Sequence, residues 1–259
     1  MHIVRFSGPE GIAYGTAEAE GIRVAQGSPL VEWEQDTDVV LGYDEVELLS
    51  PVLPSKVVCV GKNYVDHAAE MGSDVPETPI IFIKPATSVI GSGAPIVYPP
   101  DTHELHHEGE LAVVIRTLTR NVAAEDVGPH ILGYTCANDV TARDIQRSDG
   151  QWTRAKGFDT FCPLGPAIAT EFDPLAGMSI TTAVNGDVRQ EATTADLVFG
   201  VAELIEFISR VMTLLPGDVV LTGTPAGVGP MGVGDRVDVE IEGIGTLTNF
   251  VVAPGRSRT

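Results

Sequence analysis

The chain has 259 residues and is strongly acidic, with 16 Lys and Arg against 36 Asp and Glu and a formal charge of −20. Nucleic acids and anionic membranes repel such a surface, so we expect neither as a partner. The longest apolar runs are far shorter than the ~20 residues of a membrane-spanning helix, and the first residues carry no signal-peptide pattern. These features predict a cytoplasmic globular protein.

The first 54 residues are predicted to form a small N-terminal β domain. They contain short β-type segments, namely Ile3 to Phe6, Ile12 to Gly15 and Gly21 to Ala25. The proline-rich stretch from Ser50 to Pro54 marks the boundary, so residues 55–259 form the second domain. The three cysteines match no zinc or redox spacing and are expected to be reduced core residues: Cys59, Cys136 and Cys162.

The second domain is predicted to consist mainly of strands, because Gly and Pro separate short segments rich in Val, Ile and Thr. The expected strands are Val57 to Gly61, Ile80 to Lys84, Glu110 to Arg116, Ile131 to Val140, Ile180 to Val184, Val219 to Leu221, Val237 to Ile241 and Thr246 to Val251. Asn185-Gly186 accepts two positive φ angles and predicts a type I′ hairpin.

Few helices are expected. Apolar residues recur at helical spacing from Val201 to Met212, and Pro216-Gly217 ends this pattern. Shorter helices are predicted from Tyr64 to Met71 and from Ala142 to Arg147. Because strands and helices do not alternate as a doubly wound parallel sheet requires, we predict an α+β fold. Its centre is a mixed, mainly antiparallel β-sandwich roll.

The segment from His103 to Glu110 contains two competing metal-site patterns. His103 and His107 match the H-E-x-x-H spacing of zinc peptidases, which requires both histidines on one helix. Pro99-Pro100 precedes the segment and an apolar strand pattern follows it, so a helix is not expected here. A zinc peptidase nevertheless remains one alternative function.

Three carboxylates form the second pattern. On a strand, Glu108 and Glu110 point to the same face, and Asp139 ends another apolar strand. Adjacent anions repel one another unless a cation or proton lies between them, and oxygen ligands favour Mg²⁺, Mn²⁺ or Ca²⁺ over zinc. The alternatives are a solvated strand end for the glutamates and a helix N-cap for Asp139.

Taken together, six ordered motifs between Lys56 and Val251 resemble the fumarylacetoacetate hydrolase superfamily. They are Val60-Gly61-Lys62-Asn63-Tyr64-Val65-Asp66-His67 with Glu70, Phe82-Ile83-Lys84-Pro85, His107-Glu108-Gly109-Glu110, Asn138 to Gln146, Lys156-Gly157-Phe158-Asp159 and Leu221 to Gly229. The first motif is more similar to the branch of acylpyruvate hydrolases, oxaloacetate decarboxylases and 2-hydroxyhepta-2,4-diene-1,7-dioate isomerases than to the namesake enzyme.

The resemblance implies a homodimeric enzyme that binds one Mg²⁺ or Mn²⁺ through Glu108, Glu110 and Asp139. Its substrate would be a small 2-oxo or β-diketo acid, which reacts through a metal-stabilised enolate. The reaction would be C–C bond hydrolysis, decarboxylation or keto–enol isomerisation.

The same resemblance suggests roles for further residues. Lys156 would add positive charge near a developing oxyanion, and the alternative is a surface lysine. Arg143 and Gln146 lie three apart on a predicted helix and would bind a substrate carboxylate or carbonyl, unless Arg143 serves only a helix salt bridge. Thr224, in a glycine-flanked turn, would offer a hydroxyl and backbone N–H groups.

His67 and Glu70 are the candidate general base and its partner. At positions i and i+3 of a short helix they share a face, so Glu70 could orient His67 and raise its basicity to activate a water. The segment Met71 to Asp74 that follows suits a lid. The alternative is a surface histidine beside an acid, and a non-catalytic Ca²⁺-binding module remains a further possible function.

Overall fold

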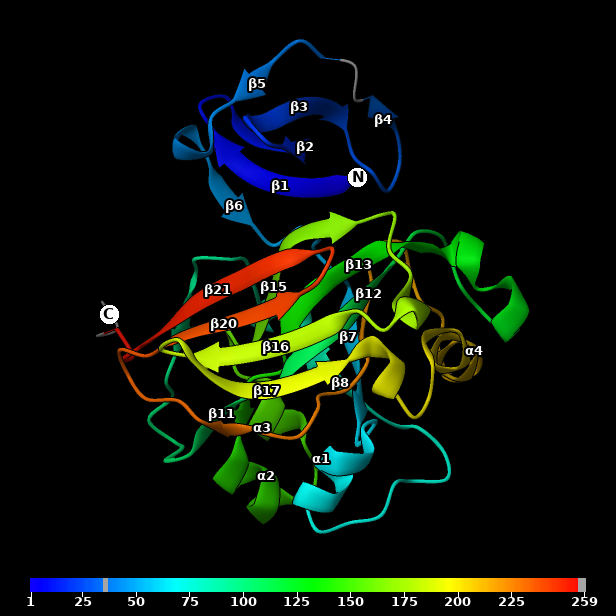
Figure 1. The fold of residues 1–259 in the computed structure, drawn as a ribbon, viewed down its shortest axis with the longest axis vertical. Coiled ribbons are helices and arrows are strands. Elements are labelled where there is room, and N and C mark those ends of the chain that lie inside the picture. The colour runs from blue at the N-terminus through cyan, green and yellow to red at the C-terminus, as the bar shows by residue number, and fades with distance from the viewer. Residues whose placement is uncertain (35–36, 256–259) are drawn as a thin grey trace.

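The computed structural model describes residues 1–34 and 37–255 and consists mainly of β-sheets with few helices, as the sequence predicts (Figure 1). The strands are β1 His2–Gly8, β2 Gly11–Glu18, β3 Gly21–Gly27, β4 Trp33–Glu34, β5 Val40–Leu41, β6 Glu47–Leu49, β7 Lys56–Gly61, β8 Ile80–Pro85, β9 Val89–Ile90, β10 Pro95–Val97, β11 Leu105–His107, β12 Gly109–Ile115, β13 Ile131–Asn138, β14 Thr141–Ala142, β15 Cys162–Ala169, β16 Ser179–Val184, β17 Asp187–Thr193, β18 Val219–Leu221, β19 Gly229–Pro230, β20 Arg236–Ile241 and β21 Gly245–Val252. The α-helices are α1 Val65–Glu70, α2 Arg143–Asp149, α3 Thr153–Lys156 and α4 Val201–Val211.

The strands form three sheets. The large sheet has 13 strands, and its main path runs β4-β3-β2-β1-β15-β13-β12-β18-β7-β8. A five-stranded sheet, β10-β21-β20-β16-β17, lies in front of the centre of the large sheet in Figure 1, and β14, β11 and β19 form a small third sheet. Most neighbours are antiparallel, while the pairs β7–β18, β9–β15 and β10–β21 are parallel.

Strand β12 lies at the centre of the hydrophobic core and is buried along its whole length. Successive side chains of a strand point to opposite faces. Leu111 and Val113 therefore pack with the five-stranded sheet and α4, whereas Ala112 and Val114 pack on the opposite face. This burial on both faces explains why the strand continues after Glu110 as an uninterrupted apolar run.

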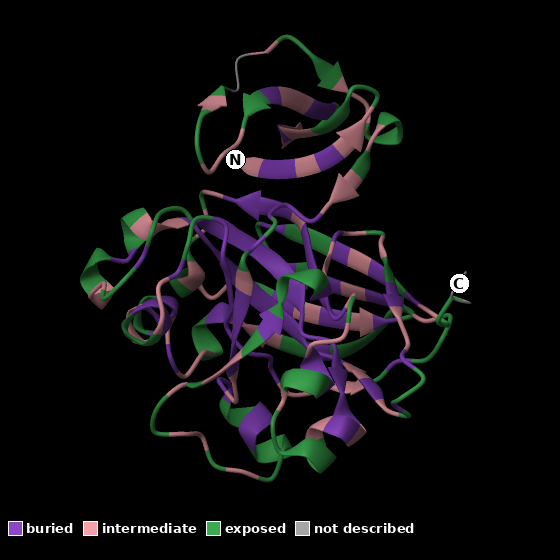
Figure 2. Cartoon of the chain, turned by 180° about the vertical axis from the view of Figure 1, so that it is seen from behind, coloured by how far each residue is buried: buried purple, intermediate pink, exposed green. Residues whose placement is uncertain are grey.

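The N-terminal strands β1 to β6 lie apart from the main body in Figure 1, yet they extend its large sheet. The connection is antiparallel pairing between β1 and β15, in which His2 and Ile3 lie opposite Ala169 and Ile168. Val4 and Phe6 contribute to a separate small core. In Figure 2 the buried residues are concentrated in the main body, and few lie in the N-terminal strands. The expected division into residues 1–54 and 55–259 remains a prediction.

Most predicted local elements are present. Helix α4 spans Val201–Val211, and Asn185 and Gly186 have φ angles of 53° and 85° in the turn between β16 and β17. The helix expected from Ala142 begins instead at Arg143, because Thr141 and Ala142 pair with β11. The three cysteines are free and buried, and no described helix has the length and apolar character needed to cross a membrane.

Asp218 holds together the segment that leads from the N-terminal strands into β7. Its carboxylate accepts hydrogen bonds from the Ser55 hydroxyl at 2.6 Å and from the backbone N–H groups of Ser55 and Leu215, at 3.0 and 2.8 Å. It also forms an ion pair with the Lys56 ammonium. Burial alone would favour the neutral acid, but these partners hold the pKa of Asp218 below its usual range.

We expect Asp218→Asn to lower the free energy of unfolding at pH 7 by about 1–3 kcal/mol, because charge-assisted hydrogen bonds are lost. The folded-state pKa is depressed, so the stabilisation is present above the unfolded pKa of ~3.9 and is lost as pH falls through the folded pKa. Urea titrations from pH 7 to pH 3 should therefore show the two proteins converging in acid. A constant difference over this range would contradict the assignment.

Candidate active site

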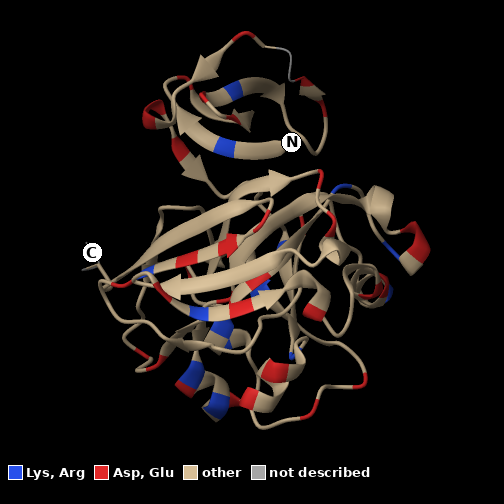
Figure 3. Ribbon diagram, in the orientation of Figure 1, with Lys and Arg blue, Asp and Glu red and all other residues tan. Residues whose placement is uncertain are grey.

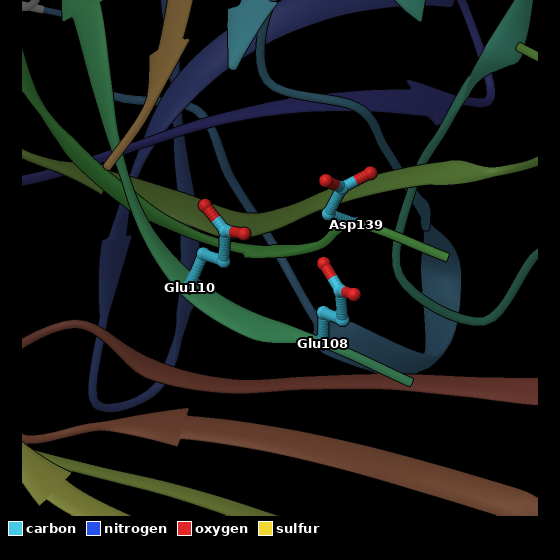
Figure 4. A group of neighbouring side chains, drawn as sticks. All are labelled: Glu108, Glu110 and Asp139. Atoms are coloured by element: carbon cyan, nitrogen blue, oxygen red, sulfur yellow. The ribbon is translucent and has the colours of Figure 1, made fainter. Parts of the chain in front are cut away.

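Glu108, Glu110 and Asp139 meet at one end of the central strands. Glu108 precedes β12, Glu110 is its second residue, and Asp139 directly follows β13. The Asp139 N–H donates to the Glu108 carbonyl at 2.8 Å, which fixes the two strand ends side by side. One oxygen from each carboxylate lies within 4.8 Å of the others, and all three residues are at most 4 % exposed. Figure 4 shows the three side chains as close neighbours.

The residue between the two glutamates is Gly109. The second sheet passes so close to this position that a side chain would not fit. A Cβ atom at this position would lie 2.0 Å from the Thr182 hydroxyl oxygen on β16, so a larger residue would push the sheets apart. Gly223, with φ +103°, approaches from the turn after β18 and donates its N–H to Glu110 at 2.7 Å. Both glycines thus belong to the geometry that fixes the carboxylates.

Three buried cationic side chains surround this cluster. The Lys156 ammonium, on α3, donates to Glu108 at 2.8 Å, to Asp139 at 2.6 Å and to the Thr141 hydroxyl at 2.8 Å. Arg143, on α2, donates to Glu108 at 2.6 Å, and Lys84, on β8, pairs with Asp139. In Figure 3, Lys and Arg are visible on α2 and α3.

The two glutamates experience opposite environments. Burial opposes the ionisation of Glu108, but Lys156 and Arg143 hold its pKa below the usual range. Burial raises the pKa of Glu110 well above its usual range, and the charges of Asp139 and Glu108 raise it further. Among the described side chains, no cationic group forms an ion pair with Glu110. This carboxylate therefore needs a proton or a further cation.

A divalent cation fits this cluster. One oxygen of each carboxylate lies within 4.8 Å of the others, so the three side chains are close enough together to hold one cation between them. An all-oxygen donor set suits Mg²⁺, Mn²⁺ or Ca²⁺. A cation would also neutralise the charge that burial and its neighbours disfavour on Glu110.

His67 and Glu70 lie beside the cluster on α1. The His67 Nδ1 atom is 3.2 Å from a Glu70 carboxylate oxygen, and the Gly227 N–H donates to Glu70 at 3.1 Å. Because an ionised carboxylate only accepts hydrogen bonds, Nδ1 carries the hydrogen of this contact, and a neutral ring keeps a lone pair on Nε2. His67 is buried and lines the same cavity as Glu108 and Asp139.

The cavity between these residues is small, with a volume of about 40 Å³. Its wall includes all three residues expected to bind substrate: Arg143, Gln146 and Thr224. Arg143 also donates to Gln146 at 2.6 Å. The Thr224 hydroxyl donates to the Gly109 carbonyl at 2.9 Å and accepts from Gln190 at 2.7 Å, so both its contacts lie within the protein.

Three buried polar residues that the motif analysis left without a role support the site. Lys84 is 0 % exposed, and its ammonium forms an ion pair with the Asp139 carboxylate. The Asn63 amide bonds to the backbone of Phe199 and Thr222, and Gln190 connects the Gly109 N–H to Thr224. Only Lys84 carried a usable signal in the sequence, because it follows three isoleucines and one phenylalanine in a β-type segment, where a charged residue is uncommon.

Two alternative interpretations of the sequence are wrong. The segment around the histidines is extended, since β11 spans Leu105–His107, and His103 is exposed while His107 is buried against Gln190. The two histidines therefore cannot share a helical turn as a zinc peptidase requires. Asp139 is not a helix N-cap, because Ala142 occupies that position of α2.

Comparisons with known proteins identify the family of this chain. Residues 56–252 match the model of the fumarylacetoacetate (FAA) hydrolase C-terminal family, and residues 1–51 match the Rv2993c-like N-terminal family. Protein Rv2993c of Mycobacterium tuberculosis is 50 % identical over 99 % of this chain and 100 % of its own length. The human mitochondrial oxaloacetate tautomerase FAHD2B is 46 % identical over 82 % of this chain and 72 % of its own.

A solved structure extends the similarity to the whole chain. The 2-hydroxyhepta-2,4-diene-1,7-dioate isomerase from Mycobacterium marinum superposes with a TM-score of 0.91 at 48 % identity, covering 99 % of this chain and 100 % of that chain. The chain therefore belongs to the fumarylacetoacetate hydrolase family of enzymes.

Proposed function

We propose that this enzyme acts on a small 2-oxo or β-diketo acid through its enolate and needs Mg²⁺ or Mn²⁺, with keto–enol isomerisation as its main reaction. The observation that carries the proposal is one cavity lined by Glu108, Asp139 and His67 together with Arg143 and Lys156. Glu110 completes the carboxylate cluster beside this cavity, and Glu70 contacts His67. The names of the human tautomerase and the mycobacterial isomerase favour isomerisation over hydrolysis or decarboxylation.

Glu108, Glu110 and Asp139 are the proposed metal ligands. A bound divalent cation would supply a Lewis acid that favours the enolate over the keto form of a 2-oxo acid. Lys156 already donates hydrogen bonds to Glu108, Asp139 and Thr141, which accounts for the three N–H groups of an ammonium. We therefore assign it the role of a fixed positive charge beside the reacting oxygen atoms.

Arg143, Gln146 and Thr224 are the proposed substrate contacts, because all three line the cavity. The cavity is small, so we expect neighbouring groups at its edge to move when a 2-oxo acid enters. Met71, which directly follows α1 and lines the cavity, is the proposed moving edge. Its displacement would carry the His67–Glu70 pair toward or away from the substrate.

We expect His67→Ala to lower kcat/KM for hydrolysis of an acylpyruvate by about 10²- to 10⁴-fold, the usual contribution of a general base. Hydrolysis needs a hydroxide-like nucleophile, which the Nε2 lone pair of His67 can generate from water. Tautomerisation should lose much less, because solvent can carry its proton once the enolate charge is stabilised. The measurement is a paired assay of acetylpyruvate cleavage and oxaloacetate tautomerisation with the Mn²⁺-loaded enzyme.

Equal losses on both substrates would mean that His67 is not a dedicated water-activating base. A wild-type enzyme without activity on any 2-oxo or β-diketo acid, in the presence of Mg²⁺ or Mn²⁺, would contradict the proposed function itself. Binding of Ca²⁺ without turnover under these conditions would instead support the non-catalytic module.

We further propose a cytoplasmic homodimer with a separate N-terminal domain over residues 1–54. The edge strand β8 supports the dimer, because it ends the large sheet and exposes Ile80 and Ile83, which are 37 % and 40 % accessible. Exposed apolar strands at a sheet edge need cover to avoid uncontrolled pairing.

A further inference from the structure

Lys62 is a cationic side chain in the wall of the catalytic cavity to which neither the fold nor the proposed chemistry assigns a task. Arg143 and Lys156 line the same cavity, and both are bound to carboxylates of the cluster. Among the described residues, the Lys62 ammonium has no ion-pair or hydrogen-bond partner. It is partly exposed and lines this cavity.

The backbone at Lys62 adopts a conformation that favours glycine. Its φ angle is +59°, and the residues on both sides are fixed. A Cβ atom on Gly61 would lie 2.7 Å from the Trp152 ring, while the Asn63 amide accepts from the Phe199 N–H at 2.8 Å and donates to the Thr222 carbonyl at 2.7 Å. A lysine held in a sparsely populated conformation at a site wall is a candidate for function.

The charges of the site leave Lys62 available for the substrate. The cluster holds three buried carboxylates, Glu108, Glu110 and Asp139, and three buried cations, Lys84, Arg143 and Lys156, so their formal charges sum to zero although Glu110 has no ion pair of its own. A divalent cation would add two positive charges, of which a 2-oxo carboxylate neutralises one. The Lys62 ammonium adds another positive charge at the cavity wall, and a second carboxylate on the substrate would complement it.

We propose that Lys62 binds the second carboxylate of a 2-oxo dicarboxylic acid and makes the enzyme prefer dicarboxylic over monocarboxylic substrates. The proposal rests on the proposed function, because it concerns the same site and the same class of reaction. A charge-assisted hydrogen bond to a carboxylate corresponds to about 10- to 100-fold in kcat/KM.

The test compares oxaloacetate with its 4-methyl ester, which keeps the 2-oxo acid and removes only the second charge. We expect Lys62→Met to lower kcat/KM for oxaloacetate about 10- to 100-fold more than kcat/KM for the ester. Lys62→Arg should restore most of the preference, because it restores the charge. An equal effect of Lys62→Met on both compounds, or no rescue by arginine, would overturn the proposal.

Lys62→Gly separates function from folding. It should lose the same preference as Lys62→Met while raising the Tm by about 2–4 °C, since glycine adopts the left-handed conformation freely. Asn121→Gly is the matched control, because exposed Asn121 also has a positive φ, of 50°, and does not line the cavity. It should leave the substrate preference unchanged. A lower Tm for Lys62→Gly would contradict the argument from backbone conformation.

Failure of the proposed function can be distinguished from failure of the inference about Lys62. If the wild-type enzyme converts neither compound, the proposed function is wrong, and calorimetric binding of the two compounds to the Mn²⁺-loaded protein decides the role of Lys62. Tighter binding of oxaloacetate than of the ester, lost in Lys62→Met, would support the inference. Equal affinities in the wild type would overturn it.

Discussion

Glu110→Gln is expected to abolish metal-dependent turnover while leaving the metal-free protein at least as stable as the wild type. Burial and the neighbouring carboxylates already disfavour the charge of Glu110, so a neutral side chain of the same shape relieves that repulsion. Mn²⁺ affinity should fall about 100-fold or more, and kcat/KM about 10³-fold or more. Calorimetric Mn²⁺ titration, thermal unfolding without metal and a turnover assay measure the three quantities.

The matched control is His103→Ala, which changes an exposed histidine of the same segment and should leave all three quantities close to the wild-type values. Loss of Mn²⁺ binding in His103→Ala, together with its retention in Glu110→Gln, would contradict the carboxylate site. If Glu110→Gln instead greatly destabilises the metal-free protein, the negative charge of Glu110 must have a stabilising partner other than the described contacts.

The sequence predicts those parts of the fold that depend on local patterns. The periodic helix α4 and the Asn185-Gly186 turn are both present, because helical spacing and two positive φ angles are encoded in a few adjacent residues. Strand β15 was not predicted, since Pro163 and Pro166 interrupt its β-type pattern. Tertiary pairing with β1 and β13 nevertheless makes it a central strand. Such pairing overrides local propensity.

The sequence also predicts which carboxylates converge, but it does not predict how their charges are matched. Glu108 and Glu110 share a face because strand side chains alternate, and Asp139 lies at the end of the paired strand. Lys84 comes from β8, at the edge of the same sheet, and nothing in the local sequence places it against Asp139. Contacts between residues far apart in the chain follow from sheet order, which no single motif contains.

Asp139→Asn should have the opposite effect on stability to Glu110→Gln, although both changes remove one proposed metal ligand. Asp139 pairs with both Lys84 and Lys156, which are 0 % and 2 % exposed. Removing its charge leaves Lys84 as a buried cation without a counter-ion, a change that costs about 3–5 kcal/mol of stability. Urea denaturation of the metal-free variants, compared with Glu110→Gln, measures this difference.

The double variant Lys84→Met/Asp139→Asn tests whether the unpaired lysine causes the loss. Methionine fills a similar volume without charge, and Lys156 keeps its ion pair with Glu108 when Asp139 is neutral. The double variant should therefore recover about 1–3 kcal/mol relative to the sum of the two single changes. Strictly additive losses would mean that Asp139→Asn acts through its other contacts, such as the Lys156 hydrogen bond at 2.6 Å, and not through Lys84.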